Sequence, residues 1–327
     1  MCGRAACTLC PDDIQKACSY RDKPRGKFKK PEWKEREGTT HLYKPSYNLA
    51  PTDVIPVLLS GSQFESESGR VLQPMIWGLI PPWHKGDPKT HGLTTHNCRL
   101  EGITSSKLYA SIFKRGHRCV VVCDGFFEWQ TTKGKANKQP YFIYMPQPNG
   151  IKIEEPDTWS DEWDEEVGWK GPQLIKMAGL YDKWKSPDGE DLFSCTILTT
   201  DSNETLSWLH HRMPVILETD EQVANWLDAE SVPANKALSL LTPVKMLAWH
   251  PVSTIVNNSR NKVPECIKPV DLKKPEVKKS ASGSFMDAWI KKANTPVKRE
   301  SHSKSPEAKH VKTEPKDSPV LKEVETV

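Results

Sequence analysis

The sequence has no hydrophobic run long enough to cross a membrane, and its first residues contain no apolar segment of signal-peptide length. Hydrophobic residues make up only 36% of the 327 residues, whereas charged residues make up 27%. We therefore expect a chain that does not enter a membrane and carries no secretion signal.

Cysteine is present, but not in the patterns that build disulfide frameworks or zinc ribbons. The nine cysteines are an odd number and are irregularly spaced, which favours a reducing compartment and free thiols. Cys7 with Cys10, and Cys119 with Cys123, form close pairs that lack the second half-site or histidine spacing of a zinc site. We expect no metal and no cofactor.

A net charge is lacking over the first 270 residues as a whole. The sequence carries 46 basic and 42 acidic residues, of which 13 and 9 lie in 271–327, so the rest is neutral. The balance is not local, because eight carboxylates fall in 154–166 and eight basic side chains in 21–36. A basic surface beside a separate acidic loop suits a polyanion such as nucleic acid, although ordinary solvated loops are the simpler interpretation.

Short strand-like runs outnumber helical patterns. The strand-like runs are 54–59, 71–79, 119–129, 140–144, 176–184, 193–200 and 214–217, and the helical patterns are 11–20, 108–115, 203–210, 221–228 and 234–241. Strands and helices do not alternate regularly, which argues against a doubly wound parallel sheet. We predict an α+β fold in which one domain, residues 2–270, surrounds a curved, mostly antiparallel sheet or barrel with peripheral helices.

Two segments are set apart from this domain. An acidic, tryptophan-containing stretch at about 150–172 interrupts two strand-like runs and is predicted to be an inserted loop. Residues 271–327 are rich in Lys, Pro, Ser and Glu, which predicts a disordered tail. An apolar cluster in the tail loosely resembles a sliding-clamp-binding segment or is a bystander, and two lysines match the sumoylation pattern aliphatic-Lys-x-Glu. The cluster is Phe285, Met286, Trp289 and Ile290, and the lysines are Lys298 and Lys312.

The second residue offers chemistry that no internal cysteine has. Removal of Met1 leaves Cys2 with a free α-amino group two carbons from its thiol. The amine condenses with an aldehyde to an imine, and the thiol then closes a five-membered thiazolidine ring. An α-amino group has a pKa of roughly 7.7–8.0, so a useful fraction is uncharged at neutral pH. Cys2 is therefore a candidate nucleophile, although many chains lose Met1 before a small residue without consequence.

Several motifs follow one another in an order that resembles a known family. They are residues 1–4 (MCGR), 47–52 (YNLAPT), 77–83 (WGLIPPW), 97–101 (NCRLE), 124–129 (DGFFEW), 178–181 (AGLY), 210–214 (HHRMP) and 256–258 (VNN). Together they resemble the SOS-response-associated peptidase (SRAP) family from Cys2 to about Pro264. The basic loop and charged tail are most similar to its eukaryotic members. Cys98 and Phe127 depart from the family's usual alanine and tyrosine.

The resemblance implies a sensor of abasic sites in single-stranded DNA. Such a protein crosslinks to the aldehyde form of the abasic sugar through Cys2, as a thiazolidine, and shields the lesion at replication forks in the nucleus. Met1 is released autocatalytically or by an aminopeptidase. The resemblance also leads us to expect a monomer without a cofactor.

The resemblance assigns roles to further residues. Asn97 is expected to orient the α-amine or the sugar hydroxyl, Glu128 to shuttle protons at a raised pKa, and His210 to protonate the sugar's ring oxygen. His210 is preferred to His211 because the family pattern places the histidine two residues before an arginine. The expected DNA contacts are Arg4, Arg99 and Arg212 at phosphates, Trp77, Pro81, Pro82 and Trp83 at bases, and Glu101.

Two other functions remain open. An N-terminal nucleophile with a histidine and a carboxylate can also act as a protease on peptide substrates. Alternatively, an aromatic pocket for one flipped base would serve a non-catalytic reader of 5-hydroxymethylcytosine. A reader has no use for a free N-terminal thiol, which favours the crosslinking function.

Overall fold

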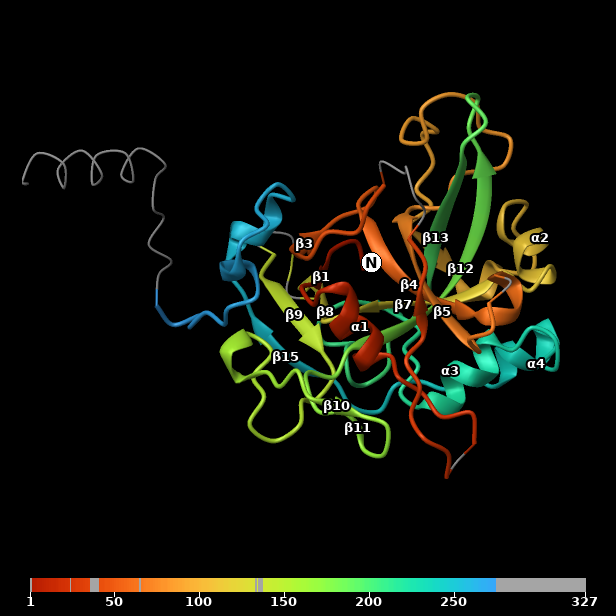
Figure 1. Ribbon diagram of the computed structural model, residues 1–327. Coiled ribbons are helices and arrows are strands. Elements are labelled where there is room, and N and C mark those ends of the chain that lie inside the picture. Colours follow the sequence, from red (N-terminus) through yellow and green to blue (C-terminus); the bar gives the residue numbers. More distant parts are fainter. Residues whose placement is uncertain are drawn as a thin grey trace, which may run out of the picture. The chain divides into compact units, whose positions relative to one another are not determined.

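Two twisted sheets organise the protein, as the computed structural model shows (Figure 1). It describes residues 2–274 except 24, 36–40, 65, 133 and 135–137. The smaller sheet is antiparallel throughout and consists, in spatial order, of β15 (Ala248–Pro251), β9 (Pro140–Tyr144), β8 (Gly125–Trp129), β1 (Ala5–Cys7) and β3 (Ser46–Leu49). It therefore joins the first strand of the chain to the last one described.

The larger sheet is mixed but mainly antiparallel. Its spatial order is β14 (Arg212–Pro214), β13 (Asp191–Asp201), β12 (Ile175–Lys185), β7 (Arg118–Cys123), β4 (Val54–Ser60), β5 (Arg70–Trp77) and β2 (Glu32–Trp33). A further strand, β6 (Asn97–Arg99), runs parallel to β13, as β5 does over a short stretch. The predicted α+β class with mostly antiparallel strands is confirmed.

The continuous apolar run predicted as one strand, 119–129, is in fact shared between the two sheets. β7 belongs to the larger sheet and β8 to the smaller one, and Asp124 lies between them. The Asp124 carboxylate accepts hydrogen bonds from the backbone N–H and the hydroxyl of Thr8, at 2.8 and 2.7 Å. This buried contact fixes the point at which the chain passes from one sheet to the other.

Short helices cover the sheets. They are α1 (Pro11–Ala17), α2 (Tyr109–Lys114), α3 (Asp220–Leu227) and α4 (Ala234–Ser239), with 3-10 turns at Gly61–Phe64, Leu100–Gly102, Pro156–Thr158, Thr254–Asn257 and Pro264–Cys266. α3 begins with a capping box between Thr219 and Gln222. It packs on β7, where the Trp226 indole N–H donates to the Cys119 carbonyl at 2.9 Å.

The helix predicted at 203–210 is wrong. The segment forms successive hydrogen-bonded turns, because the Asn203 side chain accepts from the Thr205 N–H and donates to the Val244 carbonyl. A side chain that competes for local backbone groups favours turns over a helix. The turns leave His210 two residues before the start of β14.

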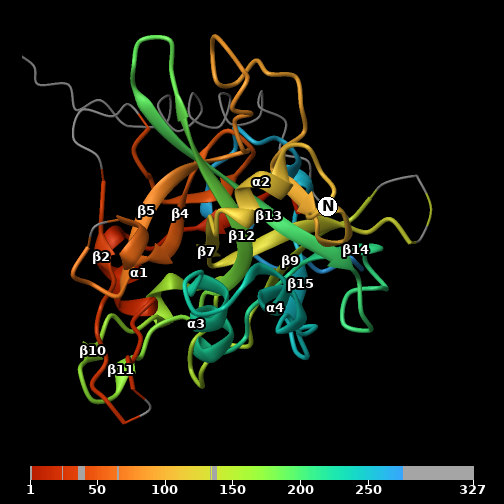
Figure 2. The same cartoon turned by 90° about the vertical axis from the view of Figure 1, so that its right-hand side faces the viewer.

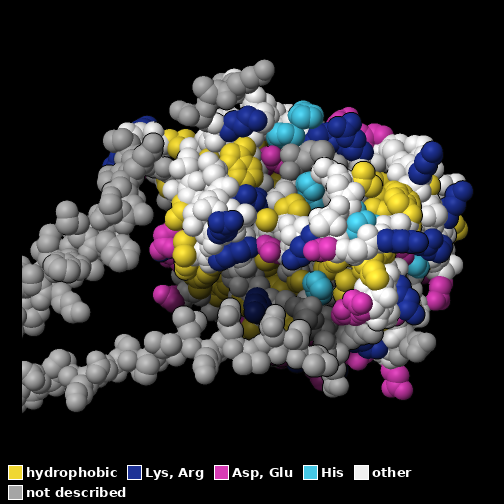
Figure 3. Space-filling model, turned by 90° about the horizontal axis from the view of Figure 1, so that it is seen from above, with side chains coloured by type: hydrophobic (Ala, Val, Ile, Leu, Met, Phe, Trp, Pro, Cys, Tyr) yellow, Lys and Arg dark blue, Asp and Glu magenta, His cyan; other side chains and the backbone are white. Residues whose placement is uncertain are grey.

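One end of the protein is built from two projecting segments. The β12–β13 hairpin and the loop 81–96 extend in the same direction in both views (Figures 1 and 2). They are joined by the Trp184 indole N–H, which donates to the His84 carbonyl at 3.0 Å. Viewed from this end, lysine, arginine and histidine side chains are interspersed with hydrophobic ones (Figure 3).

The acidic segment forms a small hairpin from β10 (Trp163–Asp164) and β11 (Gly168–Trp169). It packs against the basic segment, since the Phe28 N–H donates to the Glu165 carbonyl at 2.7 Å and Lys27 pairs with the Glu165 carboxylate at 2.8 Å. The two charged segments therefore partly neutralise each other, although such exposed ion pairs contribute little to stability.

Two further predictions concern membrane-spanning segments and the tail. Among the described residues, no helix has the length and apolar character needed to cross a membrane. The tail residues singled out above, Phe285, Met286, Trp289, Ile290, Lys298 and Lys312, lie outside the described residues.

Candidate active site

Cys2 lies just ahead of β1, which is held between two other strands. Ala5 faces Phe126 of β8, and the Phe127 N–H donates to the Arg4 carbonyl at 2.9 Å. β8 can approach its other neighbour closely because it begins with glycine: a Cβ on Gly125 would lie 2.5 Å from the Ile143 carbonyl oxygen. These contacts bring the first residues of the chain alongside β8.

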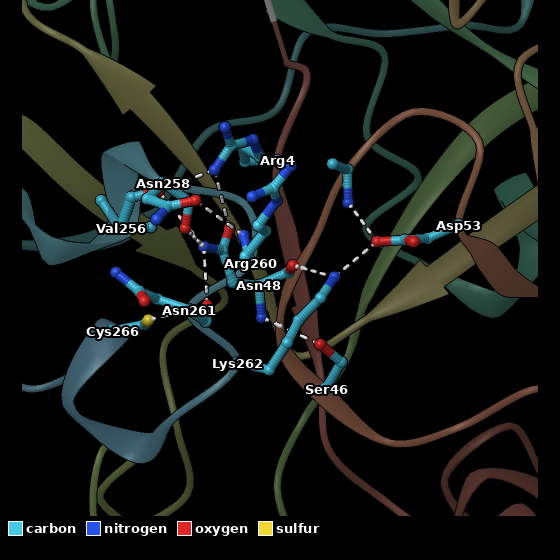
Figure 4. A network of polar contacts seen from close by, with 11 residues as sticks. Arg4, Ser46, Asn48, Asp53, Val256, Asn258, Arg260, Asn261, Lys262 and Cys266 are labelled. Atoms are coloured by element: carbon cyan, nitrogen blue, oxygen red, sulfur yellow. Dashed lines mark hydrogen bonds and ion pairs between the residues drawn. The ribbon is translucent and has the colours of Figure 1, made fainter. Parts of the chain in front are cut away.

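The Arg4 side chain anchors this N-terminal segment (Figure 4). Its Nη1 donates to Asn48 Oδ1 at 3.1 Å and to the Val256 carbonyl at 2.6 Å, and its Nη2 donates to the Asn257 carbonyl at 3.0 Å. Burial lowers the pKa of the guanidinium. Arg4 therefore has a structural role, and its contact with a phosphate stays a prediction.

Asn48 connects the same segment to the end of the domain (Figure 4). Besides accepting from Arg4, its side-chain amide donates to the carbonyls of Val256, Asn258 and Asn261 at 3.0 to 3.2 Å. Lys262 then donates to the Asn48 carbonyl at 2.6 Å. Two motifs more than 200 residues apart thus meet beside the N-terminus, where they fix the segment that leads from Cys2 into β1.

The Asn97 side chain hydrogen-bonds to the backbone of Cys2. Its Nδ2 donates to the Cys2 carbonyl at 2.8 Å, and its backbone is fixed by parallel pairing with Ile197 of β13. The amide oxygen, Asn97 Oδ1, is buried and has no hydrogen-bond partner among the described residues. An acceptor therefore remains available next to Cys2.

Glu128 supplies a carboxyl group near the same residue. It lies on β8 with 6% of its surface exposed, and its Oε1 accepts from the Trp129 N–H at 3.3 Å. Burial raises the pKa of this carboxyl above its ordinary value. The pKa of the Cys2 thiol is raised by burial and, secondarily, by the charge of Glu128, which reflects how near the two groups lie.

His210 is brought to the site by the chain that follows β8. The Thr131 N–H donates to the Leu209 carbonyl at 3.0 Å, which ties the segment before His210 to the segment after Glu128. The ring is 7% exposed, and burial lowers its pKa to about 4. The imidazole is therefore neutral at physiological pH.

Both backbone groups of Arg212 lie beside Nδ1 of His210. Nδ1 can accept from the Arg212 N–H at 3.0 Å, which puts the ring proton on Nε2, or donate to the Arg212 carbonyl at 3.2 Å, which puts it on Nδ1. The structure thus gathers the four expected catalytic side chains around the N-terminal segment. It offers a nucleophile, a neutral donor, an unused acceptor and a carboxyl group of raised pKa.

Two of the residues expected to contact DNA, Arg212 and Glu101, form an ion pair with each other. Arg212 is buried, and its guanidinium donates to both carboxylate oxygens of Glu101, with Nη2 at 3.0 Å from Oε2. Its Nη1 also donates to Asp201 Oδ1 at 2.7 Å. The hydrogen bond from Arg212 lowers the pKa of Glu101. The phosphate contact of Arg212 and the DNA contact of Glu101 stay predictions. Arg99, by contrast, is exposed.

The 77–83 motif is divided between core and surface. Trp77 is fully buried, with its indole N–H donating to the His96 carbonyl at 3.1 Å, and Pro81 is also buried. Neither residue presents a face to a base, which corrects our expectation for both. Pro82 is exposed, and Trp83 has 59% of its surface exposed, so these two remain suited to contact bases.

Sequence reasoning missed Lys138. This exposed lysine lies just before β9, and its charge influences the titration of both Glu128 and His210. Only the β8–β9 pairing, with Trp129 opposite Pro140, places it there. No motif signals it. Within the described part of the chain, no group of three or more His, Cys, Asp or Glu side chains is arranged to hold a metal ion.

The family of the protein follows from comparison with known sequences. Residues 1–259 match the family described as SOS response associated peptidase (SRAP). The protein belongs to this family, as the motifs predicted.

Individual relatives cover most of the chain. It is 48% identical to the "Abasic site processing protein HMCES" of Xenopus tropicalis over 93% of this chain and 88% of that protein. The protein of the same name from Gallus gallus is 44% identical over 92% of this chain and 88% of its own length. A solved protein from Bordetella bronchiseptica is 18% identical, with a TM-score of 0.55 over 77% of this chain and 100% of its own, and shares the fold.

Proposed function

We propose that this protein processes abasic sites in single-stranded DNA by forming a covalent thiazolidine link through Cys2. The observation that carries the proposal is the hydrogen bond from Asn97 to the Cys2 carbonyl, which holds the N-terminus beside Glu128. The names of the similar proteins, which describe abasic-site processing, support the same substrate.

The first step is the release of Met1. Hydrolysis of the Met1–Cys2 peptide bond consumes one water and frees the α-amine of Cys2. Either the chain itself or an aminopeptidase performs this cleavage. We assign the peptidase activity in the family description to this single event and not to peptide substrates.

The crosslinking steps balance without a cofactor. The Cys2 amine attacks the aldehyde carbon of the opened abasic sugar to give a carbinolamine, which loses water to form an imine. The thiol then adds to the imine carbon, a C–S bond forms, and the thiol proton passes to nitrogen. The overall loss is one water per adduct.

The surrounding residues fit these proton transfers. In the tautomer whose Nδ1 accepts from the Arg212 N–H, His210 Nε2–H can donate to the ring oxygen of the sugar as it opens. Glu128, with its pKa raised by burial, can take a proton from the amine and return it to the departing hydroxyl. Asn97 Oδ1 can accept from the amine or the sugar hydroxyl.

Intact mass after incubation with an abasic oligonucleotide tests the proposal. The expected species is the protein without Met1, plus the oligonucleotide, minus one water. An oligonucleotide with a tetrahydrofuran in place of the abasic sugar has no aldehyde and serves as the control. Absence of the adduct under conditions in which the protein binds the control strand would refute covalent processing.

The location of this activity is also part of the proposal. A substrate in DNA places the protein in the nucleus, and lesions in single strands are exposed where DNA is replicated. Imaging of the tagged full chain tests this part separately, and the expected result is accumulation at replication forks after DNA damage.

A further inference from the structure

Three aromatic rings form a cluster next to the candidate active site. The centroids of Tyr141 and Trp208 are 5.0 Å apart, those of Tyr141 and Trp249 are 5.8 Å apart, and those of Trp208 and Trp249 are 4.5 Å apart. Such separations are typical of packed aromatic pairs. The two indoles therefore form one connected aromatic surface, with Tyr141 beneath it.

This surface lies on the same face of the smaller sheet as the Glu128 carboxyl. Tyr141 of β9 is directly opposite Glu128, and Trp249 of β15 is directly opposite Ile143. Opposed residues in an antiparallel pair share a face, and so do residues two apart along a strand. Two strand spacings and a two-residue offset separate the Glu128 and Trp249 backbones by about 12 Å.

Trp208 is tied to the chain that positions His210. Its carbonyl accepts hydrogen bonds from the Thr132 hydroxyl and from the Gln130 side-chain amide, the latter at 3.4 Å. Its own indole N–H donates to the Thr205 carbonyl at 2.9 Å, which fixes the ring. A base that rests on Trp208 would therefore be held at a set distance from His210.

The cluster is not fully enclosed by the fold. Trp249 has 45% of its surface exposed, and nearby in sequence Met246 has 67% exposed. β15 ends the smaller sheet, so no further described strand covers Trp249. Lys138 and His211 are exposed near the site and provide polar groups that suit a phosphate backbone. The His211 ring lies 4.3 Å from the ring of His210.

We propose that Trp208 and Trp249 form a stacking platform for an unpaired nucleobase that neighbours the abasic nucleotide. The proposal rests on the proposed function and deepens it by naming a determinant of substrate recognition. An aromatic surface beside a site for an abasic sugar recognises what the lesion itself lacks, a base. Stacking tolerates any base, so this contact adds affinity without sequence preference.

A double-mutant cycle between Trp249 and the flanking base tests the platform. Binding is measured by fluorescence anisotropy with single strands that contain a tetrahydrofuran, so that no covalent chemistry is needed. In a second strand, the base 5′ to the tetrahydrofuran is also removed, and in a third strand the 3′ base is removed. Each strand is titrated with the unaltered full chain, with Trp249→Ala and with Trp249→Phe.

The expected result is coupling on one side only. Trp249→Ala should weaken binding to the parent strand about 5- to 160-fold, the range of one lost stacked base. It should have little effect on the strand that already lacks the base on that side. Trp249→Phe, which keeps an aromatic ring, should retain most of the affinity of the unaltered protein for the parent strand. Val167→Ala is the control, an exposed apolar side chain on the hairpin of the acidic segment, and it should bind all three strands as the unaltered protein does.

Three outcomes overturn the platform. They are unchanged affinity in Trp249→Ala, equal weakening on all three strands, or the same coupling for Val167→Ala. Failure of the proposed function would look different, since the unaltered protein would bind these strands yet form no adduct with a true abasic strand.

Discussion

The backbone N–H of Arg212 donates a hydrogen bond of 3.0 Å to Nδ1 of His210, two residues earlier in the chain. Arg212 is itself held by Glu101 and Asp201 and donates to the Thr199 carbonyl at 2.7 Å. The buried guanidinium thus helps to set the backbone that contacts the His210 ring.

Replacement of Arg212 should therefore affect stability and catalysis before DNA binding. Arg212→Ala should lower the free energy of unfolding by about 2–3 kcal/mol, because charged hydrogen bonds to a buried carbonyl are lost. The crosslinking rate should fall, while the salt dependence of DNA binding stays unchanged. Urea denaturation and binding titrations at several salt concentrations measure the two effects. A flatter salt dependence in Arg212→Ala would mean that Arg212 does contact phosphates.

Arg99 offers the contrasting case. It is exposed, so Arg99→Glu should leave the fold intact and weaken binding to single strands. Each lost phosphate contact reduces the slope of log affinity against log salt by about 0.7. Affinity that does not depend on salt in the unaltered protein would show that phosphate contacts are not the main source of binding.

Glu128→Gln should slow both formation and reversal of the adduct. Formation needs a proton removed from the amine and one delivered to the hydroxyl, and ring opening needs the reverse. Glutamine preserves the geometry but moves no proton, so a loss of about 10²–10⁴-fold is expected in each direction. Reversal is measured by adding excess abasic oligonucleotide of another length to the purified adduct. Exchange as fast as in the unaltered protein would reduce Glu128 to a structural role.

Asp124 predicts how stability depends on pH. Burial raises its pKa to about 7, whereas an aspartate in the unfolded chain ionises near 4. The folded state therefore binds more protons in this range, and the contribution of Asp124 is complete below about pH 4 and lost as the pH rises through 7. Asp124→Asn keeps an oxygen that can accept from Thr8 and should lose less stability between pH 5 and 8, by no more than about 4 kcal/mol. Parallel stability profiles for the two proteins would contradict the shift.

The fold could be predicted from the sequence where periodicity is local, and less well where partners are distant. The strand-like run 119–129 gave no sign of its division, because the break depends on the contact between Asp124 and Thr8. The pattern at 203–210 is helical in period, but Asn203 captures local backbone groups and favours turns. The short strands β1 and β6 carry too few residues for a pattern, although they place Cys2 and Asn97.

The candidate site was predicted through motif order rather than through geometry. The motifs identified Cys2, Asn97, Glu128 and His210, whose chemistry can be reasoned from their types. They did not reveal that Arg212 and Glu101 pair with each other, because an arginine in a motif looks the same whether it meets a carboxylate or a phosphate. The position of Lys138 depends on strand pairing alone.

In the proposed mechanism, both the amine and the thiol of Cys2 enter the adduct. The most direct measurement is the heat stability and intact mass of the adduct formed by Cys2→Ser, compared with the unaltered protein. Serine retains the α-amine but closes no thiazolidine, so Cys2→Ser should give at most an imine that is lost on heating, while the unaltered adduct persists. A heat-stable adduct formed equally well by Cys2→Ser would contradict the account.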